Sequence, residues 1–110
     1  MKIAVCDDDQ PIREELIRLI RKQISDVDIA EYQSGEALIN AGGNFDIYFL
    51  DIEMDSVSGM DLARHIREQE ENRKRSIIIF VTGYREYMEE AFDVNAFHYL
   101  LNPIDEEKFS

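Results

Sequence analysis

The feature that most constrains the fold is a run of five apolar residues at 77–81, Ile-Ile-Ile-Phe-Val, with no polar side chain among them. A strand that alternates apolar and polar residues exposes one face to water, whereas an unbroken apolar run is typical of a strand buried on both faces. Such strands belong to parallel sheets whose two faces are covered by helices. We therefore expect an α/β fold with this run inside the sheet.

The rest of the chain alternates between strand-like and helix-like patterns. Apolar runs predict four more strands, at 2–6, 28–33, 46–51 and 96–101. Apolar residues at helical spacing predict intervening helices, at 10–24, from Ser34 to Gly42, at 59–71 and at 85–93. Right-handed crossovers would join the strands into a three-layer sandwich around a five-stranded parallel sheet. We expect residues 1–110 to form one domain.

The composition excludes some classes of function. The 24 acidic and 12 basic side chains give a net charge of −12, so these residues alone would bind nucleic acid poorly. The single cysteine rules out an internal disulfide and suits a reducing compartment. No apolar stretch approaches the roughly 20 residues of a membrane span, so we expect a cytoplasmic protein with no membrane partner.

Acidic side chains close two of the predicted strands. Asp7 and Asp8 follow the first strand, and Asp51 follows the third. Because ligands of parallel sheets bind beyond the carboxyl ends of the strands, these carboxylates should meet at one edge, beside Thr82 and Asn102. Two carboxylates about 4 Å apart repel by roughly 4 kcal/mol at an effective dielectric constant near 20. A bound cation, a shared proton or both must offset this repulsion.

The motifs at these strand ends resemble those of a response regulator receiver domain from a two-component system. The Asp7-Asp8 pair, Asp51 in Leu-Asp-Ile-Glu-Met, Thr82 after Phe-Val, and Asn102 before a proline fall in the order of that family. The resemblance covers residues 2–108 and implies the flavodoxin-like strand order 2-1-3-4-5.

The amino-acid sequences of two segments, 80–87 and 91–101, resemble those of the LytTR class of receivers in particular. In that class a DNA-binding domain follows the receiver. The resemblance therefore implies that the full-length protein regulates transcription through a C-terminal domain that this chain lacks, and that DNA is a partner only through that domain.

The resemblance also implies a role for each residue at the acidic edge. Asp51 would accept a phosphoryl group from a sensor histidine kinase and become an aspartyl phosphate. Asp8, Asp51 and the backbone carbonyl of Glu53 would bind Mg²⁺ directly, and Asp7 would bind it through a coordinated water. Thr82 would hydrogen-bond a phosphoryl oxygen. Such a domain is a phosphoacceptor and not a turnover enzyme.

Two further positions bear on signalling. Tyr99 would be the switch aromatic, which turns inward when Thr82 moves toward the phosphate and so alters the surface of residues 84–101. Asn102 stands where family members carry a lysine that pairs with the phosphoryl group. Asparagine keeps hydrogen-bond donors but loses the charge, so we expect slower phosphorylation and a heavier dependence on Mg²⁺.

Three other functions fit part of this sequence pattern. The loss of the lysine leaves open a receiver-shaped interaction module that works without phosphorylation. A haloacid-dehalogenase-like phosphatase also places an Asp nucleophile at a strand end, but it would have a second Asp where Glu53 stands. A calcium loop starting at Asp51 is disfavoured, because its sixth position is Ser56 and its twelfth is Leu62.

The last predicted helix starts at Asp105 and has barely begun at Ser110. In the family this helix packs beside the helix of residues 10–24. We therefore expect apolar surface from Ile3 and Val5 to be left uncovered here. An uncovered apolar face favours dimerisation or exchange of elements, so a homodimer is among the expected assemblies.

Overall fold

The computed structural model describes residues 1–70, 74–104 and 109. Strands and helices alternate along the described residues in the order β1 (Lys2–Cys6), α1 (Gln10–Gln23), β2 (Asp28–Tyr32), α2 (Gly35–Ala41), β3 (Ile47–Leu50), α3 (Gly59–Gln69), β4 (Ile77–Thr82), α4 (Met88–Asp93) and β5 (His98–Leu101). The predicted helix start at Asp105 lies outside the described residues. Within them, no helix is long and apolar enough to cross a membrane.

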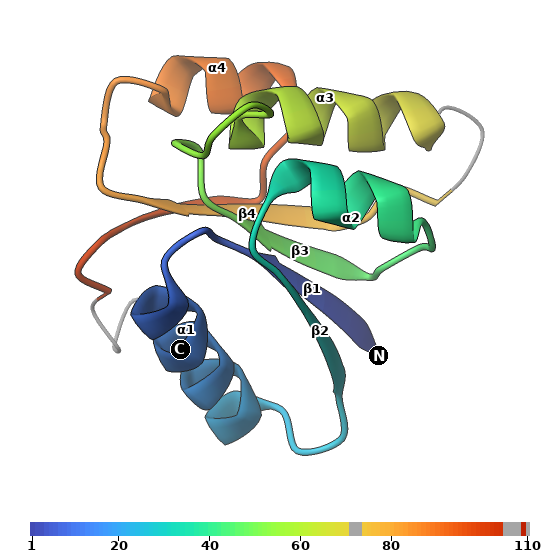
Figure 1. Cartoon of the computed structure of the whole chain (residues 1–110), viewed down its shortest axis with the longest axis vertical. Helices are drawn as coiled ribbons and strands as arrows, with labels where there is room; N and C mark the ends of the chain where they lie inside the picture. Colours follow the sequence, from blue (N-terminus) through green and yellow to red (C-terminus); the bar gives the residue numbers. More distant parts are fainter. Residues whose placement is uncertain (71–73, 105–108, 110) are drawn as a thin grey trace.

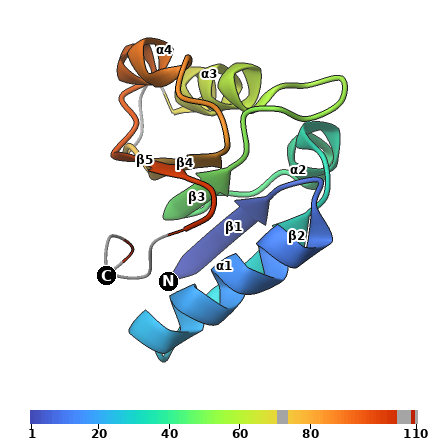
Figure 2. The same cartoon turned by 90° about the vertical axis from the view of Figure 1, so that its left-hand side faces the viewer.

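The five strands form one parallel sheet in the order β2-β1-β3-β4-β5. The sheet lies between two helical layers, with α1 on one face and α2, α3 and α4 on the other (Figures 1 and 2). This arrangement confirms the predicted three-layer sandwich and its strand order. The apolar run at 77–81 belongs to β4, which lies between β3 and β5 in the interior of the sheet.

The core has two apolar clusters, one on each face of the sheet. On β1, Ile3 and Val5 pack into the cluster under α1, whereas Ala4 and Cys6 pack into the cluster under the other helices. All four side chains are at most 1% exposed. Burial on both faces explains why the strand carries no polar alternation.

The expectation that Ile3 and Val5 would be uncovered is wrong, because both side chains are fully buried. Leu16 and Ile20 of α1 cover them, and the ring of Phe109 stacks on Phe49 of the same cluster with centroids 5.9 Å apart. What stays open on this face is a groove of about 160 Å³ between α1 and the sheet.

Side chains cap the first two helices, α1 and α2, which begin at the carboxyl edge of the sheet. Asp9 accepts a hydrogen bond from the Ile12 amide at the start of α1, and the hydroxyl of Ser34 accepts one from the Ala37 amide at the start of α2. Each such cap is worth about 1 kcal/mol. These caps confirm the predicted helix starts.

Helix α4 departs from its predicted range. The apolar spacing predicts a helix over 85–93, but α4 begins only at Met88, and Tyr87 before it makes no side-chain cap. A tyrosine side chain cannot reach back to the first amides of a helix as Ser or Asp does. Residues 83–87 therefore form an irregular segment between β4 and α4.

Gly59, the first residue of α3, lies directly against the backbone that follows β3. Its amide donates a hydrogen bond of 2.8 Å to the carbonyl of Ile52. A Cβ atom at this position would lie only 1.9 Å from the carbonyl oxygen of Asp51. Because backbone atoms form this contact, α3 can approach Asp51 this closely only with glycine here.

We expect Gly59→Ala to lower the free energy of unfolding by about 3 kcal/mol, since the added methyl group must displace backbone. Gly83→Ala is the matched control, because a Cβ there would meet no heavy atom within 4 Å. Both changes stiffen the unfolded chain equally, so the control should be neutral or slightly stabilising. Urea unfolding of the two variants measures the difference, and equal losses would contradict the prediction.

Candidate functional site

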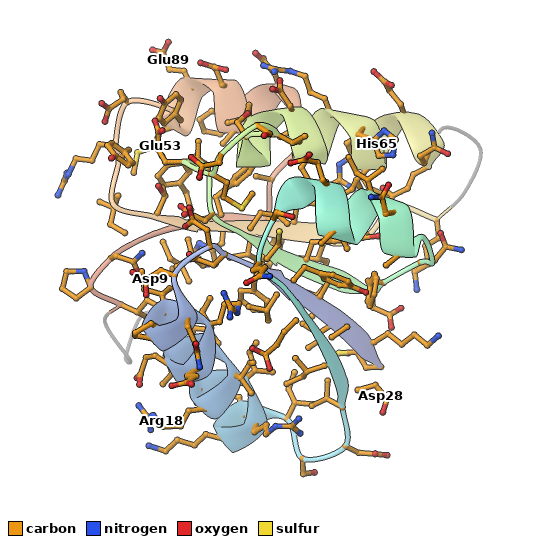
Figure 3. The ribbon with its side chains drawn as sticks, viewed as in Figure 1. Asp9, Arg18, Asp28, Glu53, His65 and Glu89 are labelled. Carbon is orange, nitrogen blue, oxygen red and sulfur yellow. The ribbon has the colours of Figure 1, made fainter. Side chains whose placement is uncertain are left out.

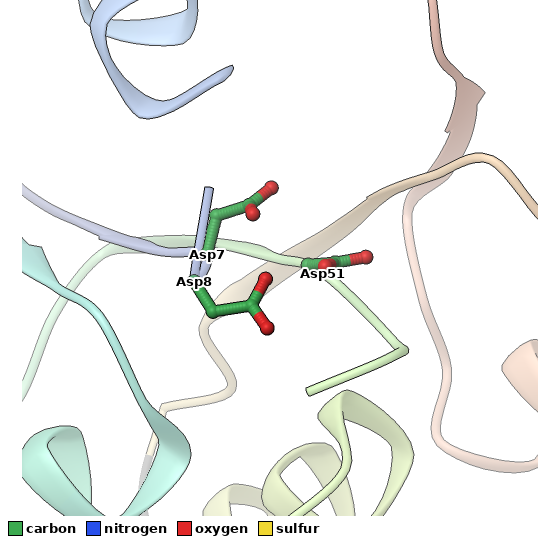
Figure 4. A group of neighbouring side chains, drawn as sticks. All are labelled: Asp7, Asp8 and Asp51. Atoms are coloured by element: carbon green, nitrogen blue, oxygen red, sulfur yellow. The ribbon is translucent and has the colours of Figure 1, made fainter. Parts of the chain in front are cut away.

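Asp7, Asp8 and Asp51 come together at the carboxyl edge of the sheet (Figure 4). The pairing of β1 with β3 places Cys6 beside Leu50, so the residues that follow these two strands are neighbours. The Asp51 amide also donates a 3.0 Å hydrogen bond to the Cys6 carbonyl. One carboxylate oxygen from each aspartate lies within 4.8 Å of the others, as the sequence predicts.

Asp7 is the most buried member of this cluster, with 1% of its surface exposed. One of its oxygens, Oδ1, accepts a hydrogen bond from the Asp9 amide, but Oδ2 has no hydrogen-bond partner. Burial raises the pKa of Asp7 to about 7, against the opposing effect of the Asp9 amide, and the charges of Asp51 and Asp8 raise it further. A buried, unpartnered carboxylate oxygen is costly unless a proton or a cation satisfies it.

Asp51 is half-buried, and Asp8 is exposed. Burial raises the pKa of Asp51 to about 6, and the charge of Asp8 raises it further, while the Thr82 hydroxyl and nearby backbone amides lower it. Asp51 is therefore mostly ionised at neutral pH, and its half-buried side chain is partly accessible to a reagent from solution.

These carboxylates fit a hard divalent cation. Three carboxylates that converge, one with an unpartnered oxygen and one exposed to water, provide the oxygen ligands and the retained waters that Mg²⁺ prefers. Glu53 points its side chain elsewhere: its Oε1 accepts a 2.6 Å hydrogen bond from the Tyr87 hydroxyl, at the start of α4 (Figure 3). Glu53 is therefore a candidate ligand of the cation only through its backbone carbonyl.

Thr82 ends β4 on the other side of Asp51 and is fully buried. Its hydroxyl lies near enough to lower the pKa of Asp51 but does not meet hydrogen-bond geometry with any partner. A buried hydroxyl without a partner is uncommon in folded proteins. This one can donate to an acceptor oxygen that arrives beside Asp51.

Asn102 and Tyr99 both lie close to this edge, because β5 pairs with β4 and places Leu101 beside Thr82. The Asn102 amide donates a 2.9 Å hydrogen bond to the Thr82 carbonyl, and the Asn102–Pro103 peptide bond is cis. Tyr99 is half-buried, and its hydroxyl donates to the backbone carbonyl of Tyr84.

Two residues at the site were not predicted from the sequence. Arg13 of α1 donates a 2.7 Å hydrogen bond to the backbone carbonyl of Asp7, with its side chain only 12% exposed. Its place in the first turns of a helix that starts at this edge is a signal that could have identified it. Tyr87 gave no such signal, since its partner Glu53 lies 34 residues away in the chain.

The chain was compared with known proteins. The family model of the response regulator receiver domain matches residues 3–110. The sensory transduction protein LytT of Oceanobacillus iheyensis is 35% identical over 109 residues, which are 97% of this chain and 44% of that protein. The transcriptional regulatory protein BtsR of Escherichia coli is 35% identical over 111 residues, 98% of this chain and 44% of that protein. The chain thus spans less than half the length of these relatives.

Solved structures give the same result. The response regulatory domain of protein mrkE from Klebsiella pneumoniae superposes with a TM-score of 0.88 at 28% identity, over 99% of this chain and 88% of that one. The response regulator TrrA of Thermotoga maritima, in complex with Mg²⁺–BeF, gives a TM-score of 0.82 at 28% identity, over 98% of this chain and 91% of that one. The chain therefore belongs to the response regulator receiver domain family and, with LytT proteins among its relatives, to the LytTR-type subclass.

Proposed function

We propose that this receiver domain accepts a phosphoryl group on Asp51 from a sensor histidine kinase, with Mg²⁺ as its cofactor. The observation that carries the proposal is a pair of buried oxygens without partners, Asp7 Oδ2 and Thr82 Oγ1. The first is suited to a cation or its bound water. The second is suited to donate to an oxygen of the incoming group. Both belong to residues next to Asp51 at the edge of the sheet.

The reaction is an attack of an ionised Asp51 oxygen on the phosphorus, as the bond from phosphorus to the donor's nitrogen breaks and the donor histidine leaves. Mg²⁺ would neutralise the negative charge shared by the carboxylates and the phosphoryl group. Thr82 would donate a hydrogen bond from its hydroxyl to a phosphoryl oxygen, and the Asn102 side-chain amide would offer a neutral donor. Asp51 needs no base, since its pKa of about 6 leaves it ionised at neutral pH.

We infer the effect of phosphorylation on transcription from the relatives. Phosphorylation adds charge at one site and biases an existing conformational equilibrium. We infer that this alters the surface of residues 84–101 through Thr82 and Tyr99, and that an attached DNA-binding domain transmits the change to transcription. The net charge of −12 supports a DNA contact outside these residues, and BtsR is called a transcriptional regulatory protein.

A phosphodonor of low molecular weight with Mg²⁺ should add one phosphoryl group to the wild-type chain and none to Asp51→Asn. Intact-mass spectrometry measures this directly. Absence of any addition to the wild type would instead favour the phosphorylation-independent interaction module, the alternative that Asn102 leaves open. Addition that survives Asp51→Asn would contradict the assignment of the acceptor.

Asn102→Lys should accelerate phosphorylation by roughly tenfold, which corresponds to about 1.4 kcal/mol of barrier. The restored ammonium group would pair with the phosphoryl oxygens, and the Mg²⁺ concentration for half-maximal rate should fall as well. Asn102→Gln is the matched control, because it lengthens the side chain without adding charge. Equal rates in all three proteins would refute a role for the missing charge.

Without divalent cations, the free energy of unfolding should fall as pH rises from about 4 to 7. In this window the folded chain keeps protons on Asp7 and Asp51, whose pKa values are about 7 and about 6, whereas the unfolded chain releases them near 3.8. Urea unfolding at several pH values measures this slope, and Asp7→Asn should flatten it.

Mg²⁺ should reverse this loss at pH 7, because it binds the folded state. Sodium chloride at equal ionic strength is the control for general screening. The cation site would be contradicted if Mg²⁺ stabilised the protein no more than sodium does.

A further inference from the structure

The hydrogen bond between Tyr87 and Glu53 joins two segments that flank Asp51. Glu53 follows Asp51 by two residues, and Tyr87 precedes α4. The donor–acceptor distance is 2.6 Å, which is typical of a strong bond from a hydroxyl to a carboxylate. It connects the loop after β3 to the segment after β4.

The segment at 83–87 depends on side-chain contacts for its conformation. It contains no strand or helix. The ring of Tyr87 packs edge-on against that of Tyr84, with centroids 6.3 Å apart. The carbonyl of Tyr84 accepts from the hydroxyl of Tyr99 on β5. The segment is thus tied to β5 by Tyr99 and to the acceptor loop by Tyr87.

This segment follows Thr82 directly, so the two are expected to move together. Thr82 Oγ1 makes no hydrogen bond of good geometry with the described residues, so we expect it to shift when it donates to an oxygen added to Asp51. The loop of Glu53 is held separately, because the amide of Gly59 donates a 2.8 Å hydrogen bond to the Ile52 carbonyl. Because the bond between Tyr87 and Glu53 is already close to the shortest normal distance, at 2.6 Å, movement of the segment relative to the Glu53 loop in either direction would strain or break it.

We propose that Tyr87 is a positioning residue, whose hydrogen bond to Glu53 holds residues 83–87 in the arrangement of the unmodified protein and opposes the rearrangement around a modified Asp51. This inference deepens the proposed function and rests on it. A ligand that binds the rearranged state requires this hydrogen bond to be broken. Its affinity is therefore lowered by the free energy of breaking the bond. Removal of the bond should therefore tighten binding of any group that imitates the phosphoryl group on Asp51.

Beryllium fluoride with Mg²⁺ is the probe, because it forms a tetrahedral adduct on a carboxylate and stands in for the phosphoryl group. Tyr87→Phe should bind it about three- to tenfold more tightly than the wild type, the range expected for one hydrogen bond. Tyr84→Phe is the matched control: it also loses one hydroxyl, three residues away, and keeps the ring contact. Its affinity, measured by calorimetry or fluorine NMR, should equal that of the wild type.

Substitutions of Glu53 separate the hydrogen bond from the charge. Glu53→Gln keeps an acceptor oxygen and removes the charge, so Tyr87→Phe should still tighten binding in that background. Glu53→Ala removes the acceptor, so Tyr87→Phe should then have no effect. Tightening that persists with Glu53→Ala, or disappears with Glu53→Gln, would overturn the proposed role of this bond.

Binding of beryllium fluoride to the wild type and to Asp51→Asn distinguishes failure of this inference from failure of the proposed function. If the wild type binds beryllium fluoride with Mg²⁺ and Asp51→Asn does not, the acceptor site stands. Equal affinities of wild type, Tyr84→Phe and Tyr87→Phe would then refute only the role of Tyr87. If the wild type shows no binding that depends on Asp51, the proposed function and this inference both fail.

Discussion

The parallel pairing of β1 with β3 is the constraint on which the rest of the molecule depends. It places Cys6 beside Leu50, and so it brings the aspartates that follow both strands within 4.8 Å of one another. The repulsion among these carboxylates is sustained because both strands are buried on each face and cannot move apart without exposing the core. Packing of the buried strands stabilises the fold, and repulsion among the carboxylates lowers the free energy of unfolding.

Among the residues that the structure describes, little positive charge lies beside this edge. Arg13 is close, but it donates to the backbone carbonyl of Asp7 and pairs with Glu31 at 3.4 Å. Asn102 brings only a neutral amide. Burial consequently raises the pKa of Asp7 to about 7 and that of Asp51 to about 6. A proton or a divalent cation can compensate this charge, which is the reason for proposing Mg²⁺ as the cofactor.

The opposite side of the site is built differently, from contacts between side chains. Thr82 is fully buried at the end of β4, yet the residues after it form no regular element before Met88. Hydrogen bonds from Tyr99 and Tyr87 hold that segment. A few hydrogen bonds, each worth about 1 kcal/mol, are easier to exchange than a packed core. In the proposed function, the acidic edge would bind the cation and the phosphoryl group, and the segment after β4 would respond to them.

The sequence by itself determined the sheet, its helical layers and the gathering of the three aspartates. These follow from local patterns: the unbroken apolar run of 77–81, apolar residues at helical spacing, and acidic residues placed at strand ends. Tertiary structure alone decided the late start of α4 and the full burial of Ile3 and Val5. It also decided the partners of Arg13 and Tyr87. The physical reason is that periodicity and capping act over a few residues, whereas these features depend on contacts between elements far apart in the chain.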